Sequence, residues 1–273
     1  MSSISTATAE WLALRAGADD RSRSTELARE LARLVGPGVV EVHDLGAGTG
    51  AMARWLAPRL PGPQHWTMRD GDPGILAHAD LRSVGDREGR PIETEWVVEH
   101  LAELPRDAFH GATVVTASAL LDVITEQEAA HIVAACVDAG VPALFSLSVT
   151  GHAELRPRAD DALEGEIGAA FADHQRRDAD GRRMLGPDAV RVVTERFAAA
   201  GWRTRTASTP WRLGEGDRAL AAAWLDGWVD AAVEQRPELA GAADDLRRRR
   251  RAQAEAGDLR VVVGHEDLLA WPG

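Results

Sequence analysis

Apolar residues along this chain fall into two alternating patterns, short continuous runs and longer stretches at helical spacing. The runs predict strands at 39–45, 64–70, 92–99, 112–117, 141–149 and 259–264, and the alternating stretch 202–208 predicts one more. The first run is rich in β-branched residues and ends at glycines, so it predicts a buried parallel strand. The stretches have apolar residues three or four positions apart and predict helices at 49–60, 73–79, 125–139, 187–200, 218–234 and 239–253. Strands that alternate with helices in this way predict a parallel sheet with right-handed crossovers and helices on both faces.

The N-terminal segment departs from this alternation. Residues 3–35 predict two helices, the second beginning near residue 21, and Gly36-Pro37-Gly38 ends them. Because these helices precede the first strand, we expect residues 1–36 to form a helical lid beside the main domain, which spans residues 37–273.

A second departure follows the fifth predicted strand. From residue 150 to about residue 183, charged residues and turn signals dominate, and a helix is expected at 162–177. We therefore expect a helical substrate cap at about 151–185, inserted into the main domain.

Three glycines lie between the first predicted strand and its helix, in the segment Asp44-Leu45-Gly46-Ala47-Gly48-Thr49-Gly50. Glycine lets the backbone turn tightly and lets a ligand approach without Cβ atoms in the way. The amides at the start of the helix can also receive a polar or anionic group. The spacing also fits the G-x-G-x-x-A form used for dinucleotides, and a tight turn with no ligand is a further alternative.

An acidic residue, Asp70, ends the second predicted strand and is followed by Gly71-Asp72-Pro73. Asp72 can cap the next helix, and proline suits the first helical position. A carboxylate at the end of this strand can accept hydrogen bonds from both hydroxyls of a ribose. It would repel a 2′-phosphate, so an NADP-type ligand is disfavoured.

Taken as a set, these segments resemble the class I S-adenosylmethionine-dependent methyltransferases. Residues 44–50 resemble the first motif of that family, Asp70 with Pro73 and Leu76 the second, 96–105 the third and 112–123 the fourth. In the third motif, His100 stands where the family frequently has an aspartate.

The resemblance implies an α/β fold with a Rossmann-like, doubly wound sheet of seven mostly parallel strands, the last of them antiparallel. The predicted strands at 202–208 and 259–264 would then be the sixth and seventh. It also implies S-adenosyl-L-methionine as the cofactor. The residues expected to bind this cofactor are Asp44, Gly46, Ala47, Gly48, Gly50, Asp70, Gly71, His100, Leu101 and Ser118.

Methyl transfer from a sulfonium depends mainly on aligning the nucleophile, the methyl carbon and the sulfur away from water. A carboxylate or imidazole can take a proton from the acceptor. Asp122, just past the fourth strand, and His174, in the cap, are the candidate catalytic residues. The alternatives are a helix-capping role for Asp122 and a charged surface helix around His174.

The candidate substrate-binding residues are Gln175, Arg176, Trp211 and Arg15. An arginine can hold a carboxylate or phosphate through two parallel hydrogen bonds. Either Arg15 or Arg23 can also pair with the carboxylate of a methionine group, although simple helix salt bridges explain both equally well. Trp211 is equally well explained by core packing, and we expect His265-Glu266-Asp267 to form a turn at the end of the last strand.

Composition narrows the range of partners. All 31 basic residues are arginine, and the formal net charge is −12, which makes nucleic acid and anionic membranes poor partners. The run Arg247–Arg251 is expected to be a solvated helix face, and the single cysteine, Cys136, a core residue. No metal-ligand spacing, signal peptide or membrane span is visible, so we expect a cytoplasmic protein without a metal.

The function that these observations favour is methyl transfer from S-adenosylmethionine to a small-molecule acceptor. Two alternatives remain at this stage. One is an NAD-dependent oxidoreductase that uses the same glycine loop, and the other is a non-catalytic protein that keeps the cofactor site.

Overall fold

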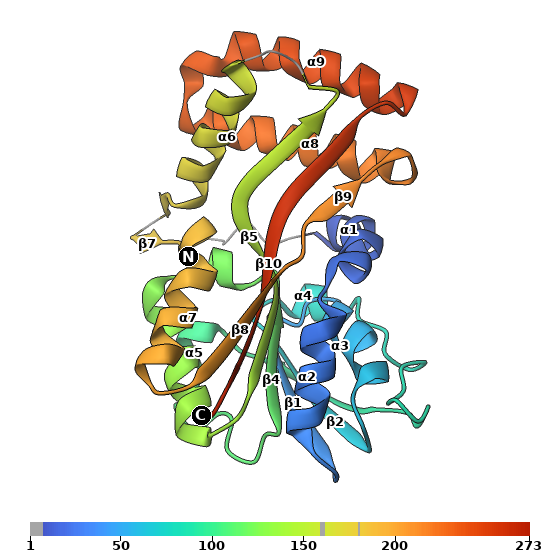
Figure 1. Cartoon of the computed structure of the whole chain (residues 1–273), viewed down its shortest axis with the longest axis vertical. Helices are drawn as coiled ribbons and strands as arrows, with labels where there is room; N and C mark the ends of the chain where they lie inside the picture. The colour runs from blue at the N-terminus through green and yellow to red at the C-terminus, as the bar shows by residue number, and fades with distance from the viewer. Residues whose placement is uncertain (1–7, 159–161, 180) are drawn as a thin grey trace.

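The computed structural model describes residues 8–158, 162–179 and 181–273 of the chain, and its centre is one large sheet (Figure 1). The strand order is β3-β2-β1-β4-β5-β10-β8, and β9 pairs with β10 off this path. The strands are β1 (Val40–Leu45), β2 (Gln64–Asp70), β3 (Glu93–Val98), β4 (Val114–Ser118), β5 (Ala143–Arg156), β8 (Arg203–Ser208), β9 (Trp211–Leu213) and β10 (Arg260–Trp271). Strands β1 to β5 are parallel, and β10 runs antiparallel between β5 and β8. The predicted fold class, with an antiparallel last strand, is confirmed.

Helices cover both faces of this sheet, as Figure 1 shows. Helices α2 (Thr25–Val35) and α3 (Ala51–Leu56) bury their apolar sides against Trp66 and Met68 on one face. Helices α5 (Glu126–Ala139) and α7 (Ala189–Ala199) pack against Phe145 and its neighbours on the other. These helices bury the apolar side chains of the central strands on both faces of the sheet.

Local capping explains where most helices begin. Thr125 and Glu128 form the capping box that the sequence predicts before α5. Asp72 caps α4 (Pro73–Leu76) through the amides of Gly74 and Ile75, although this helix ends three residues earlier than predicted. The helix predicted at 49–60 divides into α3 and the 3-10 turn η1 (Ala57–Arg59), because Pro58 interrupts the helical hydrogen bonds.

The boundary between the two N-terminal helices differs from the prediction. Helix α1 runs from Ala9 to Ser22, so it passes the predicted break near residue 21, and Ser24 caps α2. Only Arg23 and Ser24 separate the two helices, and the N-terminal part of the predicted first helix lies outside the described residues. The joint brings the side chain of Arg23 to the sheet.

Two strands are much longer than predicted. Strand β5 continues to Arg156, whereas the sequence was expected to leave the sheet at residue 150, and β10 continues to Trp271, seven residues beyond the predicted end. Beyond the sheet, these strands pair with each other as an antiparallel arm. One face of the arm is exposed and polar, so its sequence lacks the continuous apolar run that predicts a buried strand.

The prediction of a turn at His265-Glu266-Asp267 is wrong. These residues lie inside β10, where irregularities in the pairing with β5 occur between Val263 and His265 and between Glu266 and Leu268. The side chains of His265 and Asp267 are both buried. Bulges of this kind bend a strand and re-aim side chains, and they are frequent next to active sites.

Three helices pack on the arm and form the upper layer in Figure 1: α6 (Ala162–Gln175), α8 (Arg218–Gln235) and α9 (Ala240–Ala256). The helix predicted at 162–177 and the two predicted near 218–234 and 239–253 are thus present. After α6, a short hairpin follows, formed by β6 (Asp178–Ala179) and β7 (Arg182–Arg183). None of the helices in the described part of the chain is long and apolar enough to cross a membrane.

The arginine run on α9 is only partly a solvated face. Arg247, Arg248 and Arg251 form ion pairs with aspartates, as expected for such a face. Arg250, however, is 2% exposed, and its guanidinium bonds Glu164 on α6 and the carbonyl of Pro157. The prediction is wrong for this residue, which fastens α9 to α6 and to the end of the arm.

Candidate functional site

The glycine turn after β1 has the backbone that its sequence requires. Gly46, Gly48 and Gly50 all have positive φ, at 59°, 55° and 80°. The positive φ of Gly46 favours glycine there, and a Cβ atom at this position would lie 2.9 Å from the terminal methyl of Leu120. The turn leads into α3 at the carboxyl end of β1, which is where open α/β sheets bind their ligands.

Asp70 lies against this turn. One carboxylate oxygen accepts a hydrogen bond from the amide of Gly48 at 2.9 Å, and the other accepts from the amide of Asp72 at 2.9 Å. Each oxygen keeps a further lone pair for a hydroxyl donor. A Cβ atom on Gly71 would come within 2.6 Å of Nδ1 of His100, so His100 flanks the same edge.

Five buried polar atoms without a hydrogen-bond partner lie around the carboxyl ends of β1 and β4. They are Oδ2 of Asp44, Nε of Arg23, Oδ1 of Asp122, and the hydroxyls of Ser146 and Ser148. The register places Ser146 of β5 directly beside Ser118, the last residue of β4. Because buried polar atoms in proteins are normally paired, we expect ordered water or polar groups of a ligand to complete these hydrogen bonds.

Two of these groups have strongly perturbed acidities. Burial raises the pKa of Asp44 to about 7, although the hydroxyl of Thr116, 2.7 Å away, and the charge of Arg23 oppose the shift. Burial likewise raises the pKa of Asp122 to about 6, against the opposing charge of Arg15. A carboxylate with a pKa near the working pH can accept and release a proton, as a general base must.

The loop that carries Asp122 begins with strained backbone. Ala119 directly follows β4 and has a φ of 53°, which is uncommon for a residue with a Cβ atom. The 3-10 turn η3 (Leu121–Val123) follows and holds Asp122 at the same edge of the sheet as the glycine turn. Strain of this kind persists only where the surroundings enforce it, and it is concentrated at functional sites.

A second group of side chains joins α1 to β9 and β10. The guanidinium of Arg15 forms two hydrogen bonds with Asp19, at 2.8 and 3.2 Å, and lies 4.9 Å above the ring of Trp211. The indole of Trp211 donates to Asp19 at 2.9 Å and packs on the ring of His265 at 4.8 Å. The structure thus brings together Arg15 and Trp211, two of the predicted substrate residues. Trp211 is also buried, as the alternative prediction of core packing requires.

His265 belongs to this group, and it lies in β10 instead of the predicted turn. Its Nδ1 lies 3.0 Å from the carbonyl of Val263, which can only accept, so Nδ1 carries the proton. Burial and the nearby Arg15 lower the pKa of His265 to about 4. The imidazole is therefore neutral at pH 7.

The predicted cap residues lie apart from this group. His174 is 3.2 Å from a carboxylate oxygen of Glu234, and Arg177 bonds its ring and its carbonyl. Arg176 pairs with Asp188 at 2.7 Å, and the buried side-chain oxygen of Gln175 has no partner. Within the described ranges, no hydrogen bond or ion pair joins His174, Gln175 or Arg176 to the glycine turn or to Asp122, and their roles stay predictions.

Helix α1 lies over the glycine turn. The side chain of Leu12 would be 3.5 Å from a Cβ atom on Gly48, and Ile75 of α4 approaches the same point. The indole of Trp55, on α3, donates to the carbonyl of Asp20 at 3.1 Å and ties the end of α1 to the helix after the turn. Three elements far apart in sequence therefore enclose the space above the glycines.

Sequence reasoning missed several residues of this region, above all Ser146, Ser148 and His265. One signal was available for the serines. Two hydroxyls in an otherwise apolar, buried parallel strand are unusual, because each needs a partner. No comparable local signal existed for His265, whose burial depends on the pairing of β10 with β5.

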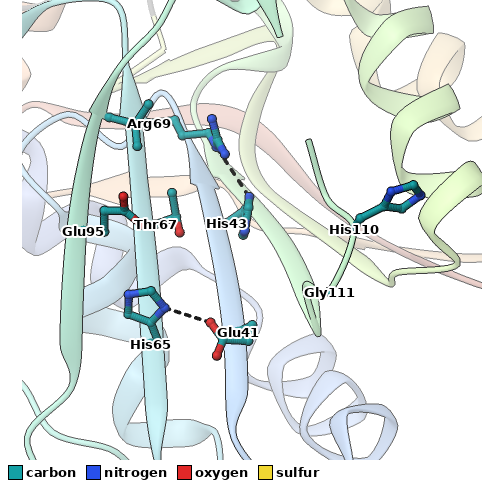
Figure 2. A pocket seen from close by; sticks show the side chains of 9 residues that line it. Glu41, His43, His65, Thr67, Arg69, Glu95, His110 and Gly111 are labelled. Atoms are coloured by element: carbon teal, nitrogen blue, oxygen red, sulfur yellow. Dashed lines mark hydrogen bonds and ion pairs between the residues drawn. The ribbon is translucent and has the colours of Figure 1, made fainter. Parts of the chain in front are cut away.

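Another polar region lies on the face of β1, β2 and β3, where a shallow hollow of about 390 Å³ opens (Figure 2). The connection between β3 and β4 contains the 3-10 turn η2 (Leu101–Glu103) instead of a covering helix. Here the polar groups pair with one another: Glu41 with His65 at 2.8 Å, and Arg69 with Glu99 at 2.6 Å and with His43 at 3.4 Å. In the described ranges, no group of three or more histidine, cysteine or acidic side chains is arranged to hold a metal ion.

The strand order, the antiparallel β10 between β5 and β8, and the glycine turn after β1 together define the fold of the class I methyltransferases. One solved structure has a similar fold. A cyclopropane-fatty-acyl-phospholipid synthase-like protein from Lactobacillus casei has a TM-score of 0.55 and 15% identity, over 94% of this chain and 92% of that one.

Two further solved structures are similar at lower scores. A S-adenosylmethionine-dependent methyltransferase from Geobacter sulfurreducens, in complex with S-adenosyl-L-homocysteine, has a TM-score of 0.46 and 15% identity over 95% of this chain and 98% of that one. A cyclopropane synthase from Mycobacterium tuberculosis has a TM-score of 0.45 and 15% identity, with 90% and 82% covered. No family model matches the sequence, and no curated protein does.

Proposed function

We propose that this protein transfers a methyl group from S-adenosylmethionine to a small-molecule acceptor. The observation that carries the proposal is the carboxylate of Asp70 on the amide of Gly48, at the carboxyl edge of a sheet with the methyltransferase strand order. This arrangement places a ribose-binding carboxylate beside a turn with room for the rest of the cofactor.

The residues present fit this cofactor. The buried, unpartnered oxygen of Asp44 and the unpartnered Nε of Arg23 provide an acceptor and a donor below the turn, and His100 flanks Asp70 where the adenosine would lie. When bound, S-adenosylmethionine would supply an electrophilic methyl group on a sulfonium. The protein would supply alignment, exclusion of water by α1, and removal of a proton from the acceptor.

Asp122 is our candidate for that proton removal. Its carboxylate lies just beyond β4, one oxygen is buried without a partner, and burial raises its pKa to about 6. At pH 7 the group is mostly ionised and can take a proton from a hydroxyl or an amine of the acceptor. His174 is retained as a second candidate on the strength of the sequence alone.

A small acceptor, rather than nucleic acid, is supported by charge. The formal net charge is −12, and carboxylates engage four of the five arginines of the α9 run. These pairs are Arg247 with Asp230, Arg248 with Asp245, Arg250 with Glu164 and Arg251 with Asp226. A phosphate backbone would be repelled by such a surface. The position of α1 over the glycine turn also favours an acceptor of limited size.

Two measurements test the proposal. Isothermal titration calorimetry should show tighter binding of S-adenosylhomocysteine than of NADH, and the reverse order would support an oxidoreductase instead. Incubation with methyl-labelled S-adenosylmethionine and a broad metabolite panel should give labelled product by mass spectrometry. Binding without any turnover across the panel would support a non-catalytic role.

A further inference from the structure

Asp267 is a carboxylate in β10 that is only 1% exposed. One of its oxygens accepts hydrogen bonds from the amide of Leu147 at 2.8 Å and from the hydroxyl of Thr209 at 2.9 Å. The other oxygen accepts from the amide of Ser24 at 2.8 Å. These donors belong to β5, to the turn between β8 and β9, and to the joint between α1 and α2. One buried carboxylate thus fastens three segments that are far apart in the sequence.

The segment of β5 that Asp267 holds is a bulge. Two residues of β5, at positions 146 and 147, lie where the paired strand β10 has one, Asp267. Leu147 is buried and has a φ of 58°, a conformation that is rare for a bulky residue. Backbone strain of this kind persists only where the surrounding structure enforces it. The hydrogen bond from the Leu147 amide to Asp267 supplies part of that enforcement.

The bulge meets the loop of Asp122 at two points. The carbonyl of Ser146 accepts a hydrogen bond at 2.8 Å from the amide of Ala119, the strained residue that begins this loop. Just after the bulge comes Val149. Burial raises the pKa of Asp122 to about 6, and the backbone amide of Val149 is among the groups that oppose this rise. The shape of the bulge therefore sets both the start of the loop and one contact of its carboxylate.

We propose that Asp267 is a positioning residue for methyl transfer, because it holds the β5 bulge that places Asp122 at the acceptor. The inference rests on the proposed function and on Asp122 as its general base, and it deepens both. The oxygens of Asp267 are engaged by protein donors, so this side chain acts through the backbone of residues 147–149 and not by touching the acceptor. Small displacements of a catalytic group can cost about 100-fold in rate, which is why such a support matters.

A carboxylate suits this position better than its amide. An ionised carboxylate accepts hydrogen bonds on both oxygens, whereas an asparagine has one accepting oxygen and an NH₂ group that only donates. In Asp267→Asn, the NH₂ group would therefore face the amide of either Leu147 or Ser24. Burial raises the pKa of Asp267, and the three donors and the charge of Arg23 oppose that rise. The substitution also removes the charge that strengthens the remaining hydrogen bonds.

The first test needs neither cofactor nor acceptor. A pH titration of the Asp122 carboxyl carbon by NMR gives the midpoint of its ionisation, and Asp122→Asn assigns the signal. In Asp267→Asn, relaxation of the bulge should withdraw the Val149 amide and raise this midpoint by about one pH unit. Loss of the negative charge of Asp267 alone would lower the midpoint, so the direction of the shift separates positioning from direct electrostatics. Arg15, the charged group that also acts on Asp122, is left unchanged.

The second test is kinetic and uses the acceptor that the metabolite panel identifies. We expect Asp267→Asn to lower kcat by about 10- to 100-fold, with the fall in kcat at low pH displaced to higher pH. The affinity for S-adenosylhomocysteine in calorimetry should stay within about threefold of the wild type.

Asp86→Asn is the matched control. Asp86 is another buried carboxylate, 3% exposed, and it accepts hydrogen bonds at 2.9 Å from the amides of Glu88 and Arg90. It lies beside Gly62, at the amino end of β2 and thus at the opposite end of the sheet. This variant should also lower the free energy of unfolding, but it should leave the midpoint of Asp122 and kcat unchanged.

The outcomes separate the two proposals. If the wild type does not bind S-adenosylhomocysteine, the proposed function fails, whatever the midpoint of Asp122 does. If the wild type binds it and Asp267→Asn leaves the midpoint unchanged or lowers it, only the positioning role of Asp267 is overturned. A loss of kcat no larger than in Asp86→Asn overturns that role as well.

A second variant covers the case in which Asp267→Asn does not fold by circular dichroism. Thr209→Val takes one of the two donors from the oxygen that holds Leu147. It should raise the midpoint of Asp122 in the same direction by a smaller amount, and an unchanged midpoint there would overturn the positioning role.

Discussion

The carboxyl edge of the sheet and the hollow over β1, β2 and β3 are both lined by charged side chains, yet their hydrogen bonding differs. In the hollow, Glu41 and His65 pair with each other, and Arg69 pairs with Glu99 (Figure 2). At the carboxyl edge, Asp44 and Asp122 each keep a buried oxygen without a partner. Groups that pair with one another have few hydrogen bonds left for a ligand, whereas the unpaired buried groups at the carboxyl edge can bind water or a ligand.

The largest effect should come from Asp70, whose carboxylate touches the glycine turn. We expect Asp70→Ala to weaken binding of S-adenosylhomocysteine by about 100-fold or more, because charge-assisted hydrogen bonds to the ribose are lost. Calorimetry measures the change. Glu95→Ala, which removes an exposed carboxylate from the hollow, is the control and should leave affinity within about twofold. Similar losses in both variants would erase the distinction between the two regions.

Asp122 should affect turnover more than cofactor binding. Asp122→Asn is expected to lower kcat by about 10²- to 10⁴-fold, the usual contribution of a general base, with affinity for S-adenosylhomocysteine nearly unchanged. Because the pKa of Asp122 is raised to about 6, the wild-type kcat should fall as the pH drops below that value. The measurement is a pH–rate profile with whichever acceptor the metabolite panel identifies. If the Asp122→Asn variant shows the same fall in kcat at low pH as the wild type, a group other than Asp122 is the general base.

Asp44 should make cofactor binding depend on pH. Burial raises the pKa of Asp44 to about 7, so this carboxyl group is neutral at lower pH. It must lose a proton before it can pair with the ammonium group at the methionine end of the ligand. Affinity for S-adenosylhomocysteine should therefore fall by up to about tenfold for each pH unit below 7. Calorimetry between pH 5.5 and 8.5 checks this expectation. Asp44→Asn should flatten the curve, and a flat curve in the wild type would show that Asp44 is not involved.

The smallest effect is expected in the hollow. Glu41→Gln removes the partner of His65, a pair in which both side chains are about one-third exposed. Such pairs contribute roughly 0–1 kcal/mol, so the free energy of unfolding should change by no more than that. Chemical denaturation measures the change, and S-adenosylhomocysteine affinity should stay the same. A marked loss of affinity would reveal a link between the hollow and the cofactor edge.

Much of the fold was readable because its signals are local. The boundaries of β2, the glycine turn and the capping box before α5 depend on residues within a few positions of one another. The extension of β5 and β10 was not readable, because an arm with one polar face lacks the continuous apolar run of a buried strand. The site was predicted in the same uneven way. The sequence placed Asp70 beside the glycines, but the contact of Arg23 with Ser118 spans 95 positions and arises only from the packing of α1 on the sheet.

The uninterrupted course of β5 and β10 also limits how this protein can be re-engineered. Leu155 and Val261 are register partners on the arm, and both are buried beneath the helices above. A one-residue insertion in either strand would turn every following side chain to the opposite face, exposing these apolar residues to water. Any exchange of α6, α8 and α9 for helices of another protein should therefore keep the lengths of β5 and β10, and replace only the helices that pack on them.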